Sequence, residues 1–179
     1  MKILILGIGN ILFGDEGIGV HLSNLLKVNY KFTSSEHSLD IIDGGTLAQS
    51  LIPLITSYDS VLILDCINAD DGNIGDVFFF DFNNIPNNLN WQGTAHEVEM
   101  LQTLKMIEIL GDLPQIKIIA TIPEILNDDT AFNLSPKIKD SCIVMRDIAL
   151  KYLKELGFSI DEVDNRDIQE IANNSFKGY

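Results

Sequence analysis

Short apolar runs alternate with segments of helical periodicity, and this alternation restricts the possible folds more than any other feature of the sequence. Five runs stop at a glycine, an aspartate or a loop, as buried strands do; they cover residues 2–6, 39–42, 60–64, 77–82 and 116–121. Apolar residues recur at helical spacing over 18–26, 47–55, 95–110 and 136–156. This order predicts an α/β domain with a mostly parallel sheet that helices cover on both faces.

Local signals indicate where the domain ends and which strand lies at its edge. The strand at 77–82 follows the strand at 60–64 through a short turn, which favours an antiparallel edge strand, whereas 31–38 reads as a polar linker. Ser135 and Pro136 are typical of the start of the last helix, and Gly157 is typical of its end. Residues 158–179 are polar and aperiodic, so we expect a domain over 1–157 followed by a mobile tail.

The charge balance argues against several classes of function. The chain has 179 residues, with 12 Lys and Arg against 26 Asp and Glu, and its formal net charge is −14. Such a surface repels phosphate backbones and anionic lipids, so we expect neither nucleic-acid binding nor membrane association. No segment approaches the roughly 18 consecutive apolar residues that insertion into a membrane requires. Cys66 and Cys142 lie in apolar or helical segments, which indicates buried, reduced thiols and a cytoplasmic location.

Residues capable of chemistry follow several of the predicted strands. In an open α/β sheet, ligands bind at the carboxyl ends of the strands. Glu16 follows the first strand, Asp65 ends the third, and His96 opens the third helix. Together they offer two oxygen ligands and one imidazole nitrogen, a set that suits zinc or nickel and leaves positions open for water or substrate. Taken singly, each has an ordinary explanation, since Asp15 and Glu16 suit a helix N-terminus and Asp65 can accept backbone donors. Two further histidines are weaker ligand candidates: His21 and His37.

The glycine-rich loop over 7–14 raises the alternative of a nucleotide- or flavin-binding protein. The dinucleotide fingerprint G-x-G-x-x-G fails because Leu12 stands at its third glycine position, and no Walker lysine follows. A second alternative is a phospho-acceptor receiver domain, which also carries acidic residues after its first and third strands. That class needs a lysine at the end of its last strand, where this chain has Thr121-Ile122-Pro123-Glu124.

A set of motifs carries a resemblance to a known family. They are Gly7-Ile8-Gly9-Asn10, Asp15-Glu16-Gly17, Asp43-Gly44-Gly45-Thr46, Leu64-Asp65-Cys66, Ala95-His96-Glu97 and Leu134-Ser135-Pro136. With these motifs, in this order across roughly residues 2–156, the chain resembles the hydrogenase maturation endopeptidases, which process the large subunit of nickel–iron hydrogenases. Many members of that family carry two aspartates where this chain has Asp15-Glu16, so its second carboxylate reaches one methylene further.

The resemblance implies a single α/β domain with a twisted five-stranded sheet. It implies an endopeptidase that removes the C-terminal extension of the hydrogenase large-subunit precursor after nickel insertion. Glu16, Asp65 and His96 fall on the family's metal-binding positions, so we expect them to be the catalytic and metal-recognising residues. The nickel is then carried by the precursor, and zinc or cadmium can replace it in vitro.

Two further expectations concern the precursor and the assembly. We expect the turn formed by Asp43, Gly44, Gly45 and Thr46 to bind the precursor, and we expect the protein to act as a monomer. The sequence contains no Ser-His-Asp, Cys-His or HExxH arrangement. It therefore leaves open whether the metal polarises the scissile carbonyl, activates water or is only recognised.

Overall fold

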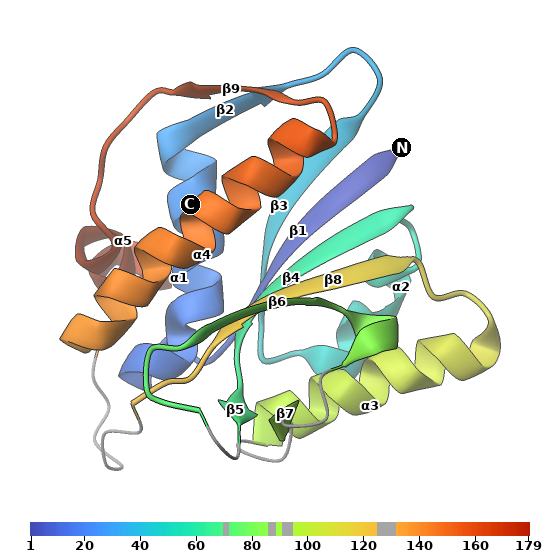
Figure 1. Ribbon diagram of the computed structural model, residues 1–179, viewed down its shortest axis with the longest axis horizontal. Coiled ribbons are helices and arrows are strands. Elements are labelled where there is room, and N and C mark those ends of the chain that lie inside the picture. Colours follow the sequence, from blue (N-terminus) through green and yellow to red (C-terminus); the bar gives the residue numbers. More distant parts are fainter. Residues whose placement is uncertain (70–71, 86–88, 91–94, 125–131) are drawn as a thin grey trace.

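Five strands form one twisted sheet in the order β3-β1-β4-β8-β6 (Figure 1). The computed structural model describes residues 1–69, 72–85, 89–90, 95–124 and 132–179, with 89–90 and 95–98 described as backbone. The strands are β1 (Lys2–Ile8), β3 (Ser38–Gly45), β4 (Ser60–Cys66), β8 (Gln115–Thr121) and β6 (Val77–Asp81). The first four are parallel, and β6 runs antiparallel to β8 at the edge. The predicted fold class and the antiparallel edge strand are confirmed.

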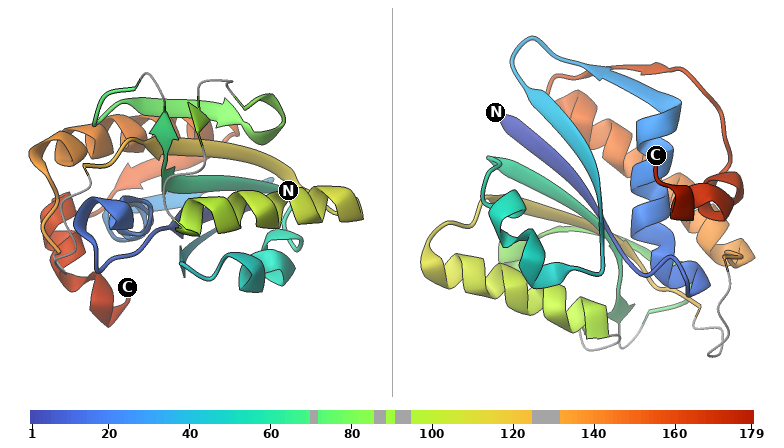
Figure 2. Two further views of the ribbon diagram at one scale, coloured as in Figure 1. Left: turned by 90° about the horizontal axis from the view of Figure 1, so that it is seen from below. Right: turned by 180° about the vertical axis from the view of Figure 1, so that it is seen from behind.

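Helices cover the sheet on both sides, as expected (Figure 2). On one side lie α1 (Ile18–Asn29) and α4 (Pro136–Glu155), and on the other lie α2 (Ile52–Ile55) and α3 (Ala95–Leu110). Shorter described elements connect them: η1 (Gly14–Gly17), η2 (Ala48–Leu51), β5 (Asn68–Ala69), η3 (Phe82–Asn84) and β7 (Leu89–Asn90). Within the described ranges, no helix is both long enough and apolar enough to cross a bilayer.

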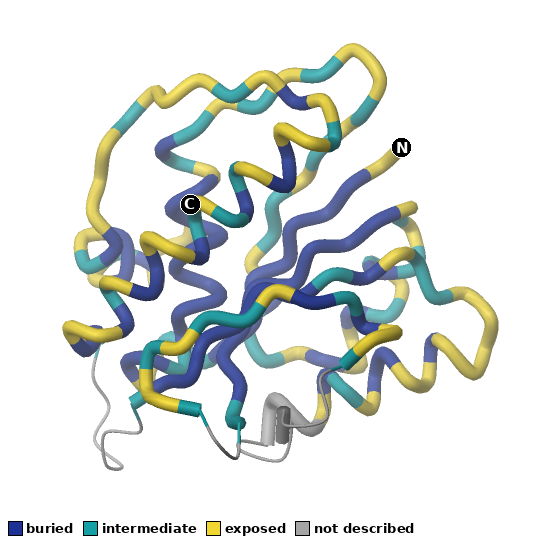
Figure 3. The backbone as a smooth tube through the Cα atoms, viewed as in Figure 1, coloured by how far each residue is buried: buried dark blue, intermediate teal, exposed yellow. Residues whose placement is uncertain are grey.

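The two central strands explain why the sequence shows continuous apolar runs. Every residue of β4 is buried, and so is every residue of β1 after Lys2 (Figure 3). The side chains of alternate residues enter two separate cores on the two faces of the sheet. Ile5 and Leu62 pack towards α1 and α4, whereas Leu6 and Ile63 pack towards α2 and α3. Because both faces of a parallel sheet are covered, its strands are apolar throughout rather than at every second residue.

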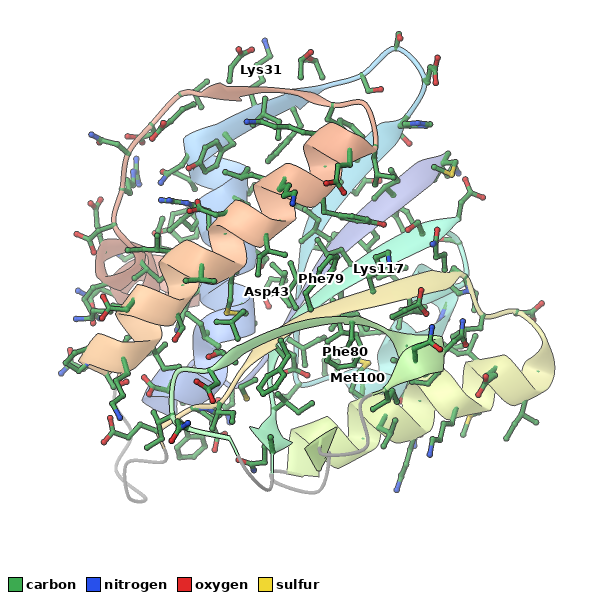
Figure 4. The ribbon with its side chains drawn as sticks, in the orientation of Figure 1. Lys31, Asp43, Phe79, Phe80, Met100 and Lys117 are labelled. Atoms are coloured by element: carbon green, nitrogen blue, oxygen red, sulfur yellow. The ribbon has the colours of Figure 1, made fainter. Side chains whose placement is uncertain are left out.

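The same alternation is visible at the edge of the sheet. Phe79 and Lys117 lie on the side of α4, where the Lys117 Nζ atom is 5.5 Å from the centroid of the Phe79 ring (Figure 4). The Phe79 ring also meets the ring of Tyr152 from α4 edge-on, at 5.8 Å between centroids. Phe80 is buried in the opposite core together with Met100 of α3. The edge strand is therefore anchored on both faces although one of its backbone edges is open.

The ends of α4 form as the sequence predicts. The Ser135 hydroxyl accepts a hydrogen bond from the Ile138 N–H at 3.3 Å, and Pro136 occupies the first turn. At the other end Gly157 adopts a φ of +90°. This conformation lets the Phe158 N–H reach the Leu153 carbonyl at 3.1 Å, which closes the last turn.

The prediction of a mobile tail over 158–179 is wrong. Residues of this segment form β9 (Ser159–Glu162), α5 (Ile168–Asn174) and η4 (Ser175–Lys177). Strand β9 pairs antiparallel with β2 (Tyr30–Thr33), so the linker expected over 31–38 is also partly a strand. Four side chains of the segment are buried in the core with α1 and α4: Phe158, Ile168, Ile171 and Ala172. The buried apolar residues of the segment therefore complete the core of the domain.

Metal removal is expected to leave this fold intact. Two large apolar cores lie on either side of the sheet, and a chain of this length buries enough surface to fold without a metal or a disulfide. Treatment with EDTA should shift the melting temperature by less than about 2 °C, since 1 kcal/mol corresponds to about 2–4 °C at this size. Circular dichroism before and after chelation checks this. Loss of cooperative unfolding on chelation would show instead that the metal is structural.

Candidate functional site

The start of α1 is pressed against the carboxyl ends of the central strands. A Cβ atom on Gly19 would collide with the carbonyl oxygens of Ile8 and Leu64, so no larger residue fits there without displacing the helix. The turn η1 immediately precedes α1 and lies against β4. This packing places η1, and Glu16 within it, at the rim of the sheet where ligands bind in α/β folds.

Asp65 lies at the same rim, near the end of β4. Its side chain is 2% exposed, and its Oδ1 atom accepts the Cys66 N–H at 2.8 Å. Alternation along β4 puts Asp65 on the face of Val61 and Ile63, towards α3, and puts Cys66 in the opposite core. The prediction that Cys66 is a core residue is confirmed. The turn η1, which carries Glu16, therefore lies beside the end of β4, which carries Asp65.

His96 lies in the first turn of α3, and its side chain falls outside the described residues. The backbone still restricts its position. Asn90 of β7 pairs with Asn68 of β5, and Asn68 lies two residues after the end of β4. Ala95 follows Asn90 by five residues, a span of at most about 18 Å. The start of α3 therefore lies within about 18 Å of Asn90, which pairs with the segment that follows β4. Among the described side chains, no group of three His, Cys, Asp or Glu is placed to hold a metal, so convergence on His96 stays a prediction.

Asp15 has a structural task that its sequence position does not reveal. Its carboxylate is 2% exposed and accepts two backbone N–H groups, from Glu124 at 3.1 Å and from Ser135 at 2.8 Å. Glu124 follows β8, and Ser135 caps α4. The hydrogen bonds of Asp15 therefore connect η1, which carries Glu16, to the segment after β8 and to the start of α4. Such charge-assisted bonds are stronger than those between neutral groups.

The Asp43-Gly44-Gly45-Thr46 turn supports the glycine loop from the side. A bulge interrupts the pairing of β1 with β3 here, so that Ile8 pairs with Gly45. The Asp43 Oδ1 atom accepts the Gly45 N–H at 2.9 Å, Gly45 has a φ of +52°, and its carbonyl accepts the Gly9 N–H at 3.0 Å. This conformation strains any residue other than glycine.

The Asp43 carboxylate lies on the other face of the sheet from Asp65. It lies on the same face of β3 as Leu39 and Ile41, which pack towards α1. Partial desolvation raises the pKa of Asp43, and the Gly45 N–H and the charge of Lys27 only partly offset that. The structure therefore joins the Asp43 turn to the glycine loop but does not place its carboxylate beside the Asp65 carboxylate.

The two weaker histidine candidates have other surroundings. The His37 Nδ1 atom is 3.1 Å from the N-terminal amino group, at the amino end of the sheet and away from the rim. His21 is fully buried in α1, and its Nδ1 atom is 2.8 Å from the Ser175 hydroxyl oxygen. Burial lowers the pKa of His21 to about 4, because desolvation disfavours the charged ring.

His21 should make the protein sensitive to mild acid. The unfolded chain takes up a proton near pH 6.5, whereas folded His21 resists until about pH 4, so stability falls as the pH drops between these values. From pH 7 to pH 5 the loss is about 2 kcal/mol. Urea unfolding of the wild type and of His21→Leu at both pH values checks this. An equally steep loss in His21→Leu would assign the acid sensitivity to other groups.

Comparison with known proteins agrees with this architecture. A sequence model of the family described as hydrogenase maturation protease matches residues 20–152. The chain belongs to the hydrogenase maturation protease family, and it is accordingly a peptidase. It is 56% identical over 160 residues to Protein HydD of Wolinella succinogenes, across 89% of this chain and 100% of HydD. It is 28% identical over 107 residues to the hydrogenase 2 maturation protease of Escherichia coli, across 60% of this chain and 63% of that protein.

A solved structure shows the same fold. The hydrogenase maturating endopeptidase HybD from E. coli superposes with a TM-score of 0.75 at 25% identity, over 90% of this chain and 98% of HybD. The resemblance inferred from the motifs is confirmed at the level of the family and the fold. The nucleotide-binding and receiver-domain alternatives find no support in these relatives. The C-terminal segment over 158–179 lies beyond the residues that the family model matches.

Proposed function

We propose that this protein removes the C-terminal extension of a nickel–iron hydrogenase large-subunit precursor after nickel has been inserted. The observation that carries the proposal is the rim itself. Asp65 is a buried residue near the end of β4, and the turn that carries Glu16 packs against the same strand. Both residues lie at the edge of the sheet where ligands bind in α/β folds, in a chain with the fold of a maturation endopeptidase. The proposal adds His96, which lies in the first turn of α3, as the third ligand.

The donor set suits a nickel ion that the substrate brings with it. Two carboxylates and one imidazole bind nickel or zinc and leave further positions for the precursor's own ligands. Asp65 and Glu16 supply negative charge to this site, and the net charge of −14 also favours a cation. In this proposal Glu16, Asp65 and His96 recognise the loaded precursor, and zinc or cadmium occupies the site when the protein is studied alone. We expect the enzyme to act as a cytoplasmic monomer.

Exposed apolar residues beside the rim favour a polypeptide substrate over a small molecule. Leu12 and Phe13 are each 44% exposed in the glycine-rich loop, and Leu47 is 63% exposed just after the Asp43 turn. The Gly9–Gly45 hydrogen bond joins the two loops that carry them. A bound precursor segment would cover these side chains, which otherwise remain in contact with water.

Incubation of the purified protein with a purified, nickel-loaded large-subunit precursor tests the proposal. Intact-mass measurement should show a large subunit shortened at its C-terminus and one released peptide. A precursor that keeps its full mass in the presence of folded enzyme would contradict the proposed function.

Asp43→Ala is expected to impair processing more than it impairs metal binding. The variant loses the acceptor that fixes Gly45 and, through it, the Gly9 loop, whereas the three proposed ligands are retained. Asp43→Asn keeps an oxygen at the same place and should process precursor at close to the wild-type rate. Cleavage kinetics and cadmium titration of both variants check this. Equal impairment by asparagine and alanine would make the charge of Asp43, rather than its turn, the important feature.

A further inference from the structure

The C-terminal segment (residues 158–179) reaches η1 through Gln169 of α5. The Gln169 Nε2 atom donates to the Phe132 carbonyl at 3.0 Å, and its Oε1 atom accepts the Leu134 N–H at 3.0 Å. The next residue along the chain, Ser135, donates its N–H to the buried Asp15 carboxylate. One amide side chain therefore fixes the backbone that in turn holds the residue preceding Glu16.

A second chain of contacts, the second route, connects Ser175 through the His21 ring to the other side of η1. The Ser175 hydroxyl donates to the Ile171 carbonyl at 3.0 Å, and its oxygen atom lies 2.8 Å from His21 Nδ1, within hydrogen-bond distance. The far side of the ring faces η1, because a Cβ atom on Gly17 would lie 2.7 Å from His21 Nε2. The ring thus fills the space behind the residue that follows Glu16.

We infer that Gln169 and Ser175 are positioning residues, through which the C-terminal segment holds η1 on both sides of Glu16. The first route ends on Asp15 and the second on Gly17, which are the two chain neighbours of Glu16. A turn that is packed and hydrogen-bonded from both sides opens less often than one held by its own short-range bonds. The inference rests on the proposed function, in which Glu16 recognises the precursor's metal.

Gln169→Ala tests the first route, with Asn29→Ala as a matched control. Asn29 is a buried amide that also connects the C-terminal segment to the domain, because it donates to the Arg166 carbonyl at 2.8 Å and accepts the Arg166 N–H at 3.2 Å. It lies at the end of α1, roughly 18 Å along the helix from η1. Each variant removes two hydrogen bonds between the C-terminal segment and the rest of the domain, and only Gln169→Ala does so close to the turn.

Hydrogen exchange and cleavage kinetics give separate readouts. In Gln169→Ala, amides of residues 14–17 should exchange at least tenfold faster and kcat/KM for the precursor should fall at least tenfold. In Asn29→Ala both should stay within twofold of the wild type. Gln169→Glu keeps an acceptor for the Leu134 N–H and should fall between wild type and alanine. Ser175→Ala should loosen the same amides by the second route.

Two results would overturn the inference: unchanged exchange at 14–17 in Gln169→Ala, or equal changes in Gln169→Ala and Asn29→Ala. Failure of the proposed function looks different. The wild-type protein would then leave the nickel-loaded precursor at its full mass, and the exchange measurements would still decide on the positioning of the turn.

Discussion

Asp65→Asn is expected to keep the fold and to lose precursor processing by at least about 100-fold, since even residues that merely orient metal ligands cost 10–100-fold. The asparagine oxygen can still accept the Cys66 N–H, so the end of β4 keeps its local hydrogen bond. It loses the negative charge that a nickel ion requires. Glu16→Gln and His96→Gln should have effects of the same size, and double variants should be no worse than single ones, because the three residues act as a unit.

Asp59→Asn is the matched control for this series. Asp59 lies just before β4, at the opposite end of the same strand, and its Oδ2 atom accepts the Lys2 N–H at 2.7 Å. The same change of aspartate to asparagine there should leave cleavage within twofold of the wild type. Cadmium binding by calorimetry, measured together with precursor cleavage, shows whether metal binding and processing are lost together. A His96→Gln protein that cleaves at the wild-type rate would remove His96 from the site.

Truncation after Gly157 is expected to abolish cooperative folding. The deleted residues include four buried side chains, and Ile171→Ala alone should cost about 2–5 kcal/mol. Domains are typically stable by only about 5–15 kcal/mol, so losing the whole segment removes a large share of the stability. The truncation also exposes the faces of α1 and α4 that the segment covers. Urea unfolding followed by circular dichroism measures both variants.

Val163→Ala supplies the control within the same segment. Val163 is 60% exposed, so this change should alter the free energy of unfolding by no more than about 0.5 kcal/mol. A truncated chain that unfolds cooperatively at the wild-type urea midpoint would show that residues 158–179 are dispensable for the fold.

The sheet was predictable because its signals are local. Strands β1 and β4 are continuous apolar runs, and the run in each is broken by Gly7 or Asp65, so pattern alone located them. The antiparallel edge strand followed from the short connection after β4. Capping of α4 by Ser135 was likewise visible in neighbouring residues.

The C-terminal segment was not predictable because its partners are distant in sequence. Strand β9 has four residues and pairs with β2, about 130 residues earlier in the chain, and α5 has only seven residues, too few to show a clear helical period. Its apolar residues Ile168 and Ile171 look isolated among polar neighbours until the fold places them against α1 and α4.

The rule for α/β sheets predicts that Glu16 and Asp65 lie at the rim, and the structure places both there, whereas their role as ligands stays a prediction. The contacts that support them could not be predicted from the sequence. Asp15 looked like a helix-dipole carboxylate, but its hydrogen-bond partners lie 109 and 120 residues away. His21 was a weaker ligand candidate in the sequence, and the structure buries its ring beside Ser175, 154 residues further along the chain.

Mass spectrometry of the peptide released from nickel-loaded and nickel-free precursor tests whether the enzyme recognises nickel. Wild-type enzyme should release one C-terminal peptide from the loaded precursor and none from the nickel-free precursor. Glu16→Gln, Asp65→Asn and His96→Gln should release little or none from either. Equal release from both precursors by the wild type would contradict recognition of nickel through these three residues.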